Sequence, residues 1–200
     1  MKDVITADDV QKVPAGGELS TGLGAIVTPW AREIAATRGI RIVQAPAALG
    51  AVVVAIGADH GGFPMKEQIK AILTRLGYRF TDQGAYSTDP VDYPDVALAV
   101  ARAVRSGEAG LGILVDGAGI GSAMAANKVP GVRAAVCVNE AAARNAREHN
   151  DANVLALGAK FVDAAALPAV IETFLTARLT EERHAKRVEK IKAIEESYLK

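Results

Sequence analysis

Residues 111–128, LGILVDGAGIGSAMAANK, contain the local signals that decide the fold. The first five, LGILV, form an apolar run of the length typical of a buried strand. A glycine-rich segment interrupts this run, and the alanine-rich residues after it have good helix propensity. The stretch therefore predicts a strand at 111–115, a tight turn, and a helix at 121–128.

The turn places several backbone N–H groups beside one acidic side chain, Asp116. With a helix N-terminus behind them, such groups favour an anion or a developing oxyanion. A carboxylate beside an oxyanion site suits proton abstraction next to a carbonyl, because the base removes a C–H proton while the N–H groups hold the enediolate oxygen. In the alternative interpretation, Asp116 only accepts hydrogen bonds from the glycine turn.

The spacing of the glycines excludes two common nucleotide-binding motifs. Gly117, Gly119 and Gly121 form GxGxG, without the third helix-packing glycine at the place that a dinucleotide fingerprint needs. The segment also lacks the Lys-Ser/Thr pair of a P-loop.

Apolar runs and helical segments alternate from residue 51 onward. Strands are expected at 51–56, 78–81, 111–115, 133–138 and 154–157, and helices at 63–76, 95–105, 121–128, 140–149, 164–176 and 181–198. The alternation predicts a three-layer, Rossmann-like α/β fold, with an open parallel sheet of about five strands and helices on both faces. Ligands in such folds bind outside the C-terminal strand ends. Asp59, His60, residues 116–122 and Asn139 fall there.

Residues 1–48 follow a different pattern and predict a small N-terminal extension, with the main domain at 49–200. A short helix capped near Thr6 is expected first, then a loop at 20–24. A strand at 25–28, a helix at 29–38 that begins with Pro29, and a strand at 40–43 follow. Residues 44–50 are interpreted as a linker.

The composition excludes several classes of protein. Twenty-three basic residues balance 23 acidic ones, which argues against nucleic-acid or membrane-surface binding. The single cysteine, Cys137, excludes an internal disulfide, and its apolar neighbours favour a core position over a nucleophilic one. The sequence contains no clustered Cys/His metal motif, no signal-peptide pattern and no apolar run that approaches a membrane span. It therefore predicts a soluble, cytoplasmic protein.

Three further groups of polar residues are candidates for a site, each with a simpler alternative. Asp59 and His60 directly follow a strand and form either a site or an ordinary loop. His149 ends a helix, where a histidine can simply complement the helix dipole. Arg183 and Arg187 share one helix face and suit a phosphate, or belong to a solvated run of charges.

Taken together, six blocks resemble one family, that of ribose-5-phosphate isomerase B and galactose-6-phosphate isomerase. The blocks are GADHGGF (57–63), VDYPD (91–95), DGAGIGSAMAANK (116–128), GVRAAVCV (131–138), AREHNDANVLALGAK (146–160) and RHAKRVEKI (183–191). They run in collinear order through residues 51 to about 195.

The resemblance implies a sugar-phosphate aldose–ketose isomerase that uses no metal or other cofactor. It also implies a homodimer or a dimer of dimers with active sites at the subunit boundary. His149 would help to open the sugar ring, Asp59 would handle hydroxyl protons, and Asp116 would stand at the position of the C–H base. The residues implied in substrate binding are His60, Tyr93, Gly117, Ala118, Gly119, Gly121, Ser122, Asn150, Lys160, Arg183, His184 and Arg187. Within this set, Asn150 and the loop amides would hold the enediolate.

The sequence departs from the family pattern at four positions. Asp116 stands where many members have a catalytic cysteine, and Ala118 where they have a threonine. Ser122 stands where other members use a glutamate. Lys160 replaces an arginine that reaches the partner subunit's phosphate, and lysine keeps the charge but loses the bidentate fork.

These observations predict the interconversion of ribose 5-phosphate and ribulose 5-phosphate through a cis-enediol, a reaction of carbohydrate metabolism in the pentose phosphate pathway. The alternatives are a hexose 6-phosphate substrate of the galactose or allose type, or a catalytically degenerate partner subunit that binds a sugar phosphate. The run GAIVTPWAREIAATRGIRIV (24–43) is similar to segments at the front of some enzymes of bacterial microcompartments. Residues 1–48 are therefore expected to be either a docking extension for a shell or cargo protein, or a structural cap.

Overall fold

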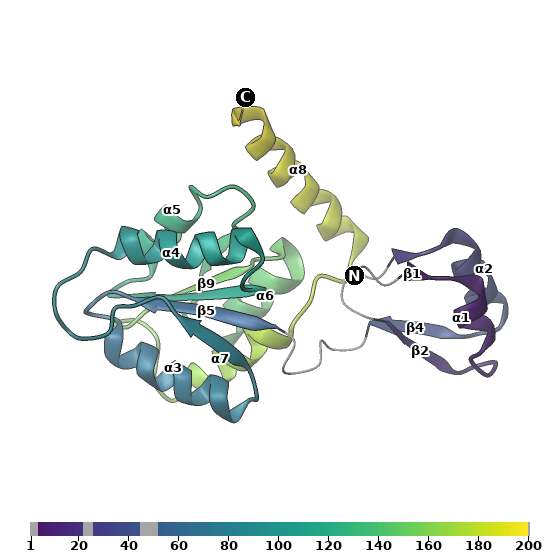
Figure 1. Ribbon diagram of the computed structural model, residues 1–200, viewed down its shortest axis with the longest axis horizontal. Helices are drawn as coiled ribbons and strands as arrows, with labels where there is room; N and C mark the ends of the chain where they lie inside the picture. The colour runs from purple at the N-terminus through teal and green to yellow at the C-terminus, as the bar shows by residue number, and fades with distance from the viewer. Residues whose placement is uncertain (1–3, 22–25, 45–51, 200) are drawn as a thin grey trace. The chain divides into compact units, whose positions relative to one another are not determined.

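The computed structural model describes residues 4–21, 26–44 and 52–199 (Figure 1). The chain divides into two compact units, Met1–Leu49 and Gly50–Lys200. Most of the predicted linker at 44–50, the predicted boundary near residue 48 and part of the predicted loop at 20–24 lie outside the described residues.

The second unit contains a five-stranded, fully parallel sheet. The strand order is β6-β5-β7-β9-β8. The strands are β5 (Val53–Ala58), β6 (Arg79–Asp82), β7 (Leu111–Asp116), β8 (Ala134–Val136) and β9 (Val154–Gly158). The uninterrupted apolar run of β7 fits its central place, because a central parallel strand is covered on both faces.

Helices cover both faces of this sheet. They are α3 (Phe63–Arg75), α4 (Tyr93–Ser106), α5 (Ile120–Ala126), α6 (Glu140–Asn150) and α7 (Leu167–Thr176), while α8 (Glu182–Tyr198) extends away from the sheet (Figure 1). Side chains of α3, α6 and α7 share one buried cluster with the sheet, and those of α4 and α5 share another. The predicted three-layer α/β fold is confirmed.

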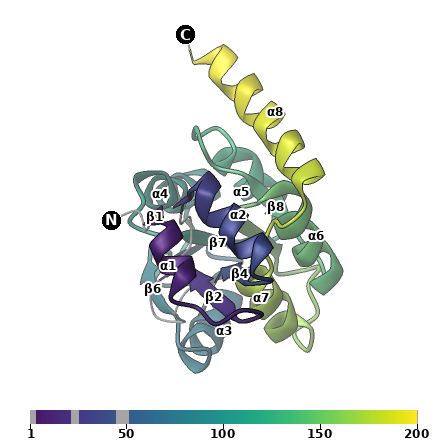
Figure 2. The same cartoon turned by 90° about the vertical axis from the view of Figure 1, so that its right-hand side faces the viewer.

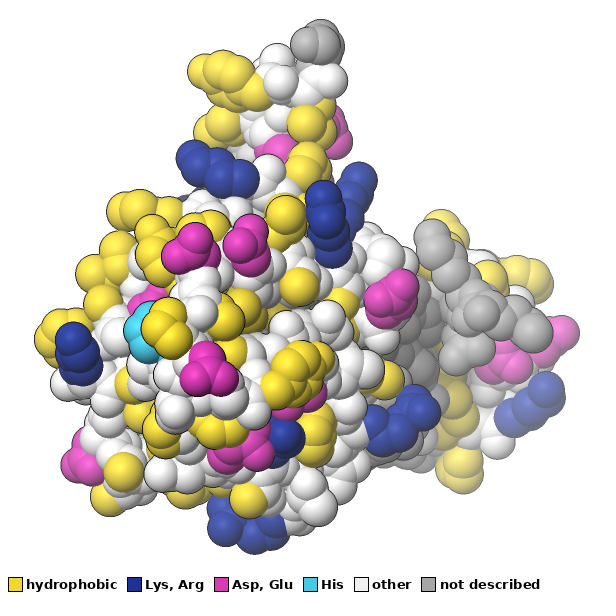
Figure 3. Space-filling model, turned by 60° about the vertical axis from the view of Figure 1, so that its left-hand side comes forward, with side chains coloured by type: hydrophobic (Ala, Val, Ile, Leu, Met, Phe, Trp, Pro, Cys, Tyr) yellow, Lys and Arg dark blue, Asp and Glu magenta, His cyan; other side chains and the backbone are white. Residues whose placement is uncertain are grey.

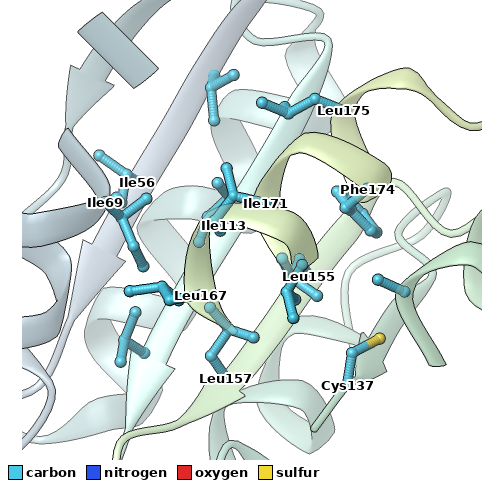
Figure 4. Close-up of a cluster of buried hydrophobic side chains, with 14 of the residues drawn as sticks. Ile56, Ile69, Ile113, Cys137, Leu155, Leu157, Leu167, Ile171, Phe174 and Leu175 are labelled. Atoms are coloured by element: carbon cyan, nitrogen blue, oxygen red, sulfur yellow. The ribbon is translucent and has the colours of Figure 1, made fainter. Parts of the chain in front are cut away.

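Large aliphatic side chains fill the core on one face of the sheet (Figure 4). Ile56, Ile113 and Leu155 project from three neighbouring strands, and Ile69 of α3 and Ile171 of α7 pack on them. Each is fully buried. Burying such a side chain contributes about 1.5–3 kcal/mol, so this layer holds the strand ends in fixed positions.

Some predicted boundaries are wrong by two or three residues. Helix α4 begins at Tyr93 instead of residue 95, because Pro94 fits the first turn of a helix, where its missing N–H costs nothing. Helix α7 begins at Leu167 instead of residue 164, since the Asp163 carboxylate accepts a hydrogen bond from the Ala165 N–H in a preceding turn. Strand β5 extends to Ala58, two residues beyond the predicted end.

The first unit, whose helices and strands are seen in Figure 2, has its own small core. Two short parallel pairs, β1 (Val4–Ile5) with β3 (Ile26–Val27) and β2 (Glu18–Thr21) with β4 (Arg41–Gln44), accompany α1 (Ala7–Gln11) and α2 (Pro29–Thr37). Strands β1 and β2 were not predicted from sequence, and β2 includes two residues of the predicted loop at 20–24. Strands of two to four residues carry too little pattern to be recognised alone.

The surface mixes charges of both signs. Figure 3 shows basic, acidic and apolar side chains interspersed over one face of the molecule. In the part of the chain that the structure describes, no helix has the length and apolar character to cross a membrane.

Candidate active site

The turn after β7 is packed tightly against the neighbouring strand β9. Gly119 adopts a left-handed conformation, with φ of 79°, and a Cβ there would lie 2.9 Å from the carbonyl carbon of Leu157. The Ala159 N–H donates to the Asp116 carbonyl at 2.8 Å, and the Lys160 N–H donates to the Gly117 carbonyl at 3.2 Å. The backbone of this turn is therefore fixed by β9 and its following residues.

The Asp116 carboxylate is turned into this loop. Oδ1 accepts hydrogen bonds from the N–H groups of Ala118, at 2.7 Å, and of Gly119. Oδ2 accepts from the Ser122 N–H at 3.0 Å and from the Ser122 hydroxyl. A carboxylate offers about four lone-pair sites, so these donors occupy all of them. Asp116 is 5% exposed, which leaves little water to compete.

These hydrogen bonds decide whether the pKa of Asp116 is raised or lowered. Burial raises it, but the donors at Ser122, Gly119 and Ala118 favour the ionised form and together lower the pKa below its ordinary value of 3.8. A general base that works at neutral pH needs the opposite shift, a pKa raised toward the working pH. The geometry thus matches the simpler interpretation of Asp116 as an acceptor for its own turn.

The same bonds show that two of the loop amides already have an acceptor within the chain. The N–H groups of Ala118 and Gly119, expected to hold an enediolate, are directed at Asp116 instead. Ile120 and Gly121 open helix α5, and the first N–H groups of a helix have no intrahelical acceptor. These two amides are the better candidates to face a ligand.

Asp59 and His60 follow β5 directly and lie beside the end of β7. The Asp59 N–H donates to the Val115 carbonyl at 3.1 Å, and its carboxylate accepts from the Gly62 N–H at 2.7 Å. His60 is exposed, and its Nδ1 lies 3.3 Å from the Val91 carbonyl oxygen. Adjacent parallel strands thus bring Asp59 close to the Asp116 turn, as predicted.

Tyr93 and Lys160 border the same turn. A Cβ on Gly121 would lie 2.6 Å from the Tyr93 ring, so the absent side chain allows tyrosine to lie over the start of α5. A Cβ on Gly117 would lie 3.7 Å from Lys160 Cε, which places that flexible side chain over the loop. We call this group the strand-end cluster, made up of Asp59, His60, Tyr93, residues 116–122 and Lys160.

The remaining predicted residues form a second group around the end of α6 and the start of α8. The His149 and His184 rings stack, with centroids 4.0 Å apart and planes 13° apart. Asn145 Nδ2 lies 3.0 Å from His149 Nδ1, and His184 Nε2 lies 3.8 Å from a carboxylate oxygen of Glu181. We call this group the helix-end cluster, made up of His149, Asn150, Arg183, His184 and Arg187.

The His184 ring is buried. It is 3% exposed, and neither ring nitrogen has a hydrogen-bond partner among the residues that the structure describes. Burial, the neighbouring His149 and the nearby Arg183 and Arg187 lower the pKa of His184, while Glu181 opposes them. Buried polar atoms are normally paired, which makes the two ring nitrogens of His184 an exception among the described residues.

The topology places the two clusters at opposite edges of the sheet. Helix α6 begins after the C-terminal end of β8 and ends at Asn150, before β9 begins at Val154. Because β8 and β9 are parallel neighbours, the helix returns the chain to the N-terminal edge. Among the described residues, no hydrogen bond, ion pair or ring contact joins the two clusters.

Comparison with known proteins decides the family. A family model described as Ribose/Galactose Isomerase matches residues 54–191. Ribose-5-phosphate isomerase B of Escherichia coli (strain K12) is 43% identical over 143 residues, which are 72% of this chain and 96% of that protein. The chain belongs to the ribose/galactose isomerase family.

Solved structures of this family agree. Ribose-5-phosphate isomerase B of Clostridium thermocellum is 49% identical, with a TM-score of 0.71, and the match covers 73% of this chain and 99% of that one. The Mycoplasma genitalium enzyme, whose structure contains ribulose-5-phosphate, is 38% identical with a TM-score of 0.70, covering 74% and 98%. The resemblance found in the sequence is confirmed, and residues before 54 lie outside the family model.

Sequence reasoning missed an ion pair in the interior of the second unit, between Lys66 and Asp82. Lys66 is fully buried, and its ammonium contacts Asp82 at 2.6 Å. The available signal was spacing, because Lys66 lies three residues after Phe63 and before Ile69, on the apolar face of its helix. Among the described residues, no group of three His, Cys, Asp or Glu side chains could hold a metal ion.

Proposed function

We propose that this protein interconverts ribose 5-phosphate and ribulose 5-phosphate through a cis-enediol. The observation that carries the proposal is the similarity to this family. The family model matches residues 54–191, and the chain covers 96% of the Escherichia coli ribose-5-phosphate isomerase B and 99% of the Clostridium thermocellum one. The strand-end cluster supports it, since it gathers carboxylates, a tyrosine hydroxyl and helix N-terminal amides where open α/β sheets bind ligands.

In the proposed reaction, a base removes the proton from C2 of the open-chain aldose, and a proton returns to C1. Asp116 is the proposed base, and Asp59 transfers protons between the substrate hydroxyls. For Asp116 to accept a proton, one of its four hydrogen bonds must open. The Ser122 hydroxyl is the donor that can rotate away, because the other three are backbone N–H groups of a fixed turn.

We further propose that a second copy completes each active site. His149 and the arginines of the helix-end cluster lie at the opposite edge of their own sheet, so a partner subunit must supply them. A groove of about 930 Å³ beside β8, α6 and α8 supports a homodimer or a dimer of dimers. Its wall includes half-exposed apolar side chains, among them Val136, Ile191 and Ile194.

Co-expression of two inactive variants tests the shared site. Asp59→Asn disables the strand-end cluster and His149→Ala disables the helix-end cluster. A mixed dimer with shared sites contains one intact site, so random pairing restores roughly a quarter of wild-type turnover. If each chain held a complete site, every site would carry one lesion and no activity would return.

The sugar is the second point to test. We expect kcat/KM for ribose 5-phosphate to be at least about tenfold higher than for allose 6-phosphate or galactose 6-phosphate. The reverse order would assign a hexose substrate.

A non-catalytic role is the second candidate, because the Asp116 carboxylate is saturated by donors of its own turn. A degenerate subunit would bind ribose 5-phosphate without exchanging the C2 hydrogen for solvent deuterium. NMR of substrate incubated in deuterium oxide separates the two candidates, since the isomerase incorporates deuterium and the degenerate subunit does not.

For the first unit we propose a docking role, which would place a cytoplasmic enzyme inside a bacterial microcompartment. Support comes from the similarity of residues 24–43 to microcompartment-associated segments, from its own core and from Trp30, which is 64% exposed. Deleting residues 1–48 should leave turnover and oligomer size unchanged and abolish co-localisation with a shell. Loss of the oligomer instead would identify a structural cap.

A further inference from the structure

The interior of the second unit contains a lysine that the proposed chemistry does not use. Lys66 of α3 is 0% exposed, and its ammonium donates to both oxygens of Asp82, at 2.6 and 2.8 Å. A third hydrogen bond reaches the Ala85 carbonyl at 2.5 Å. The ammonium also lies 5.3 Å from the ring centroids of Phe63 and Tyr86. Burying a charged pair gives little net stability, so the arrangement calls for another explanation.

The two hydrogen-bond partners of Lys66 lie at the start of the loop at 83–92, which connects β6 to α4. Asp82 is the last residue of β6, and Ala85 lies within the loop. The Asp82 carboxylate also accepts from the Gly84 N–H at 3.0 Å. The Ala58 N–H donates to the Gly84 carbonyl at 2.7 Å, and the Ala85 N–H donates to the Ala58 carbonyl at 2.6 Å. Lys66 thereby fixes the segment that borders Ala58, the residue directly before Asp59.

The far end of the same loop contacts two more residues of the strand-end cluster. Val91 lies within 3.4 Å of His60 Nδ1 through its N–H and within 3.3 Å through its carbonyl. The loop ends at Asp92, and Tyr93 follows as the first residue of α4 with its ring over Gly121. One loop thus borders Asp59, His60 and Tyr93.

The other hydrogen bonds within the loop are exposed: the Tyr86 hydroxyl donates to the Asp82 carbonyl at 3.1 Å, and the Ser87 hydroxyl donates to the Asp89 carboxylate at 2.8 Å. A cavity of about 580 Å³ lies along it, lined by residues that include Gln83, Tyr86, Val91 and Asp95. Tyr86 is 75% exposed, and Val91 is partly exposed as well. A loop with open space beside it depends on its few internal hydrogen bonds for a defined position.

We propose that Lys66 is a positioning residue of the isomerase: through Asp82 and the Ala85 carbonyl it holds the 83–92 loop, and through that loop it sets Asp59, His60 and Tyr93 around the sugar. The inference rests on the proposed function. Lys66 does not touch the substrate, so its effect on the reaction passes through those three residues.

Lys70 provides a matched control within the same network. Its ammonium contacts the same Asp82 carboxylate at 2.9 Å, and it lies one helical turn further along α3. Unlike Lys66, it makes no hydrogen bond to the loop backbone and no cation–π contact with Phe63 or Tyr86 among the described residues.

The test compares Lys66→Met with Lys70→Met in the full chain, using kcat, KM and calorimetric binding of ribose 5-phosphate. Lys66→Met should lower kcat/KM on the order of 10–100-fold, as expected when reacting groups are misplaced. Lys70→Met should stay close to wild type. Equal losses in the two variants would overturn the inference.

A double variant separates positioning from folding. Lys66→Met with Asp82→Asn removes the buried ammonium and the charge of its partly exposed partner, so Tm should recover toward that of the wild type. Turnover should remain low, because the Ala85 carbonyl still lacks its donor. Recovery of Tm and turnover together would reduce Lys66 to a structural role and overturn the inference.

The same measurements distinguish failure of the inference from failure of the proposed function. If the wild type binds ribose 5-phosphate without turning it over, catalysis is absent, yet the binding constants of the two lysine variants still test the inference. Binding weakened in Lys66→Met alone supports it, and equal binding in both variants overturns it. If the wild type neither binds nor converts ribose 5-phosphate, the proposed function falls and the inference falls with it.

Discussion

The strand-end and helix-end clusters differ in how their polar groups are satisfied. In the first, the Asp116 carboxylate accepts four hydrogen bonds from its own turn. In the second, both ring nitrogens of the buried His184 lack a hydrogen bond within the described part of the chain. A satisfied group is rigid and preorganised, whereas an unsatisfied buried group is costly until a partner arrives. The difference shows that donors within one chain satisfy the Asp116 carboxylate, while among the described residues none satisfies the His184 ring.

Replacing Asp116 gives the largest expected effect and tests whether the satisfied carboxylate still does chemistry. Asp116→Asn should lower turnover of ribose 5-phosphate by roughly 10²–10⁴-fold, the range for removing a general base. Steady-state kinetics on protein that circular dichroism shows to be folded provides the measurement. Near-normal turnover would restrict Asp116 to holding its turn.

Gly119 tests how far the strand-end turn depends on close packing. Gly119→Ala places a Cβ in a left-handed conformation, at a cost of about 1–2 kcal/mol, and forces it against Leu157 for roughly 1–3 kcal/mol more. Gly107→Ala is the control, because Gly107 has a similar φ of 82° and nothing within 4 Å of its Cβ position. Chemical denaturation should therefore show a larger loss of unfolding free energy at Gly119. Equal losses would remove the packing argument.

The pH dependence of stability tests the helix-end cluster, through the buried ring of His184. Its folded pKa is lowered, first by burial and then by His149, Arg183 and Arg187, so the unfolded chain binds more protons near its ordinary pKa of 6.5. Stability should accordingly fall as the pH drops through 6.5 and remain low below the folded pKa. Thermal unfolding from pH 8 to pH 5 measures this, and inorganic phosphate should reduce the loss. A His184→Gln variant with the same pH dependence as the wild type would assign the effect to other groups.

Cys137 should give the smallest effect, since it belongs to neither cluster. Its side chain is 1% exposed in the core, and burial raises the pKa of its thiol to about 11. Native protein at neutral pH should therefore resist thiol reagents, and denatured protein should react fully. Rapid modification of the native protein with loss of turnover would show that a thiol takes part in the site.

Most of the fold follows from sequence patterns that are local. Continuous apolar runs mark β5, β7 and β9, since parallel strands are buried on both faces. Pro94 and Gly77 mark where α4 begins and where the chain turns after α3. The short β1 and β2 could not be predicted in the same way, because their stability comes from pairing with β3 and β4 far along the chain.

The sequence by itself determined the layered α/β fold, the family resemblance and the place of Asp59 and Asp116 at strand ends, because each depends on residue type and spacing along the chain. Only the tertiary structure decided what those residues contact. It turned the Asp116 carboxylate toward its own loop, carried His149 to the opposite edge of the sheet, and buried Lys66 beneath the 83–92 loop. Hydrogen-bond direction and sheet edge depend on how distant segments pack, and sequence spacing does not encode either one.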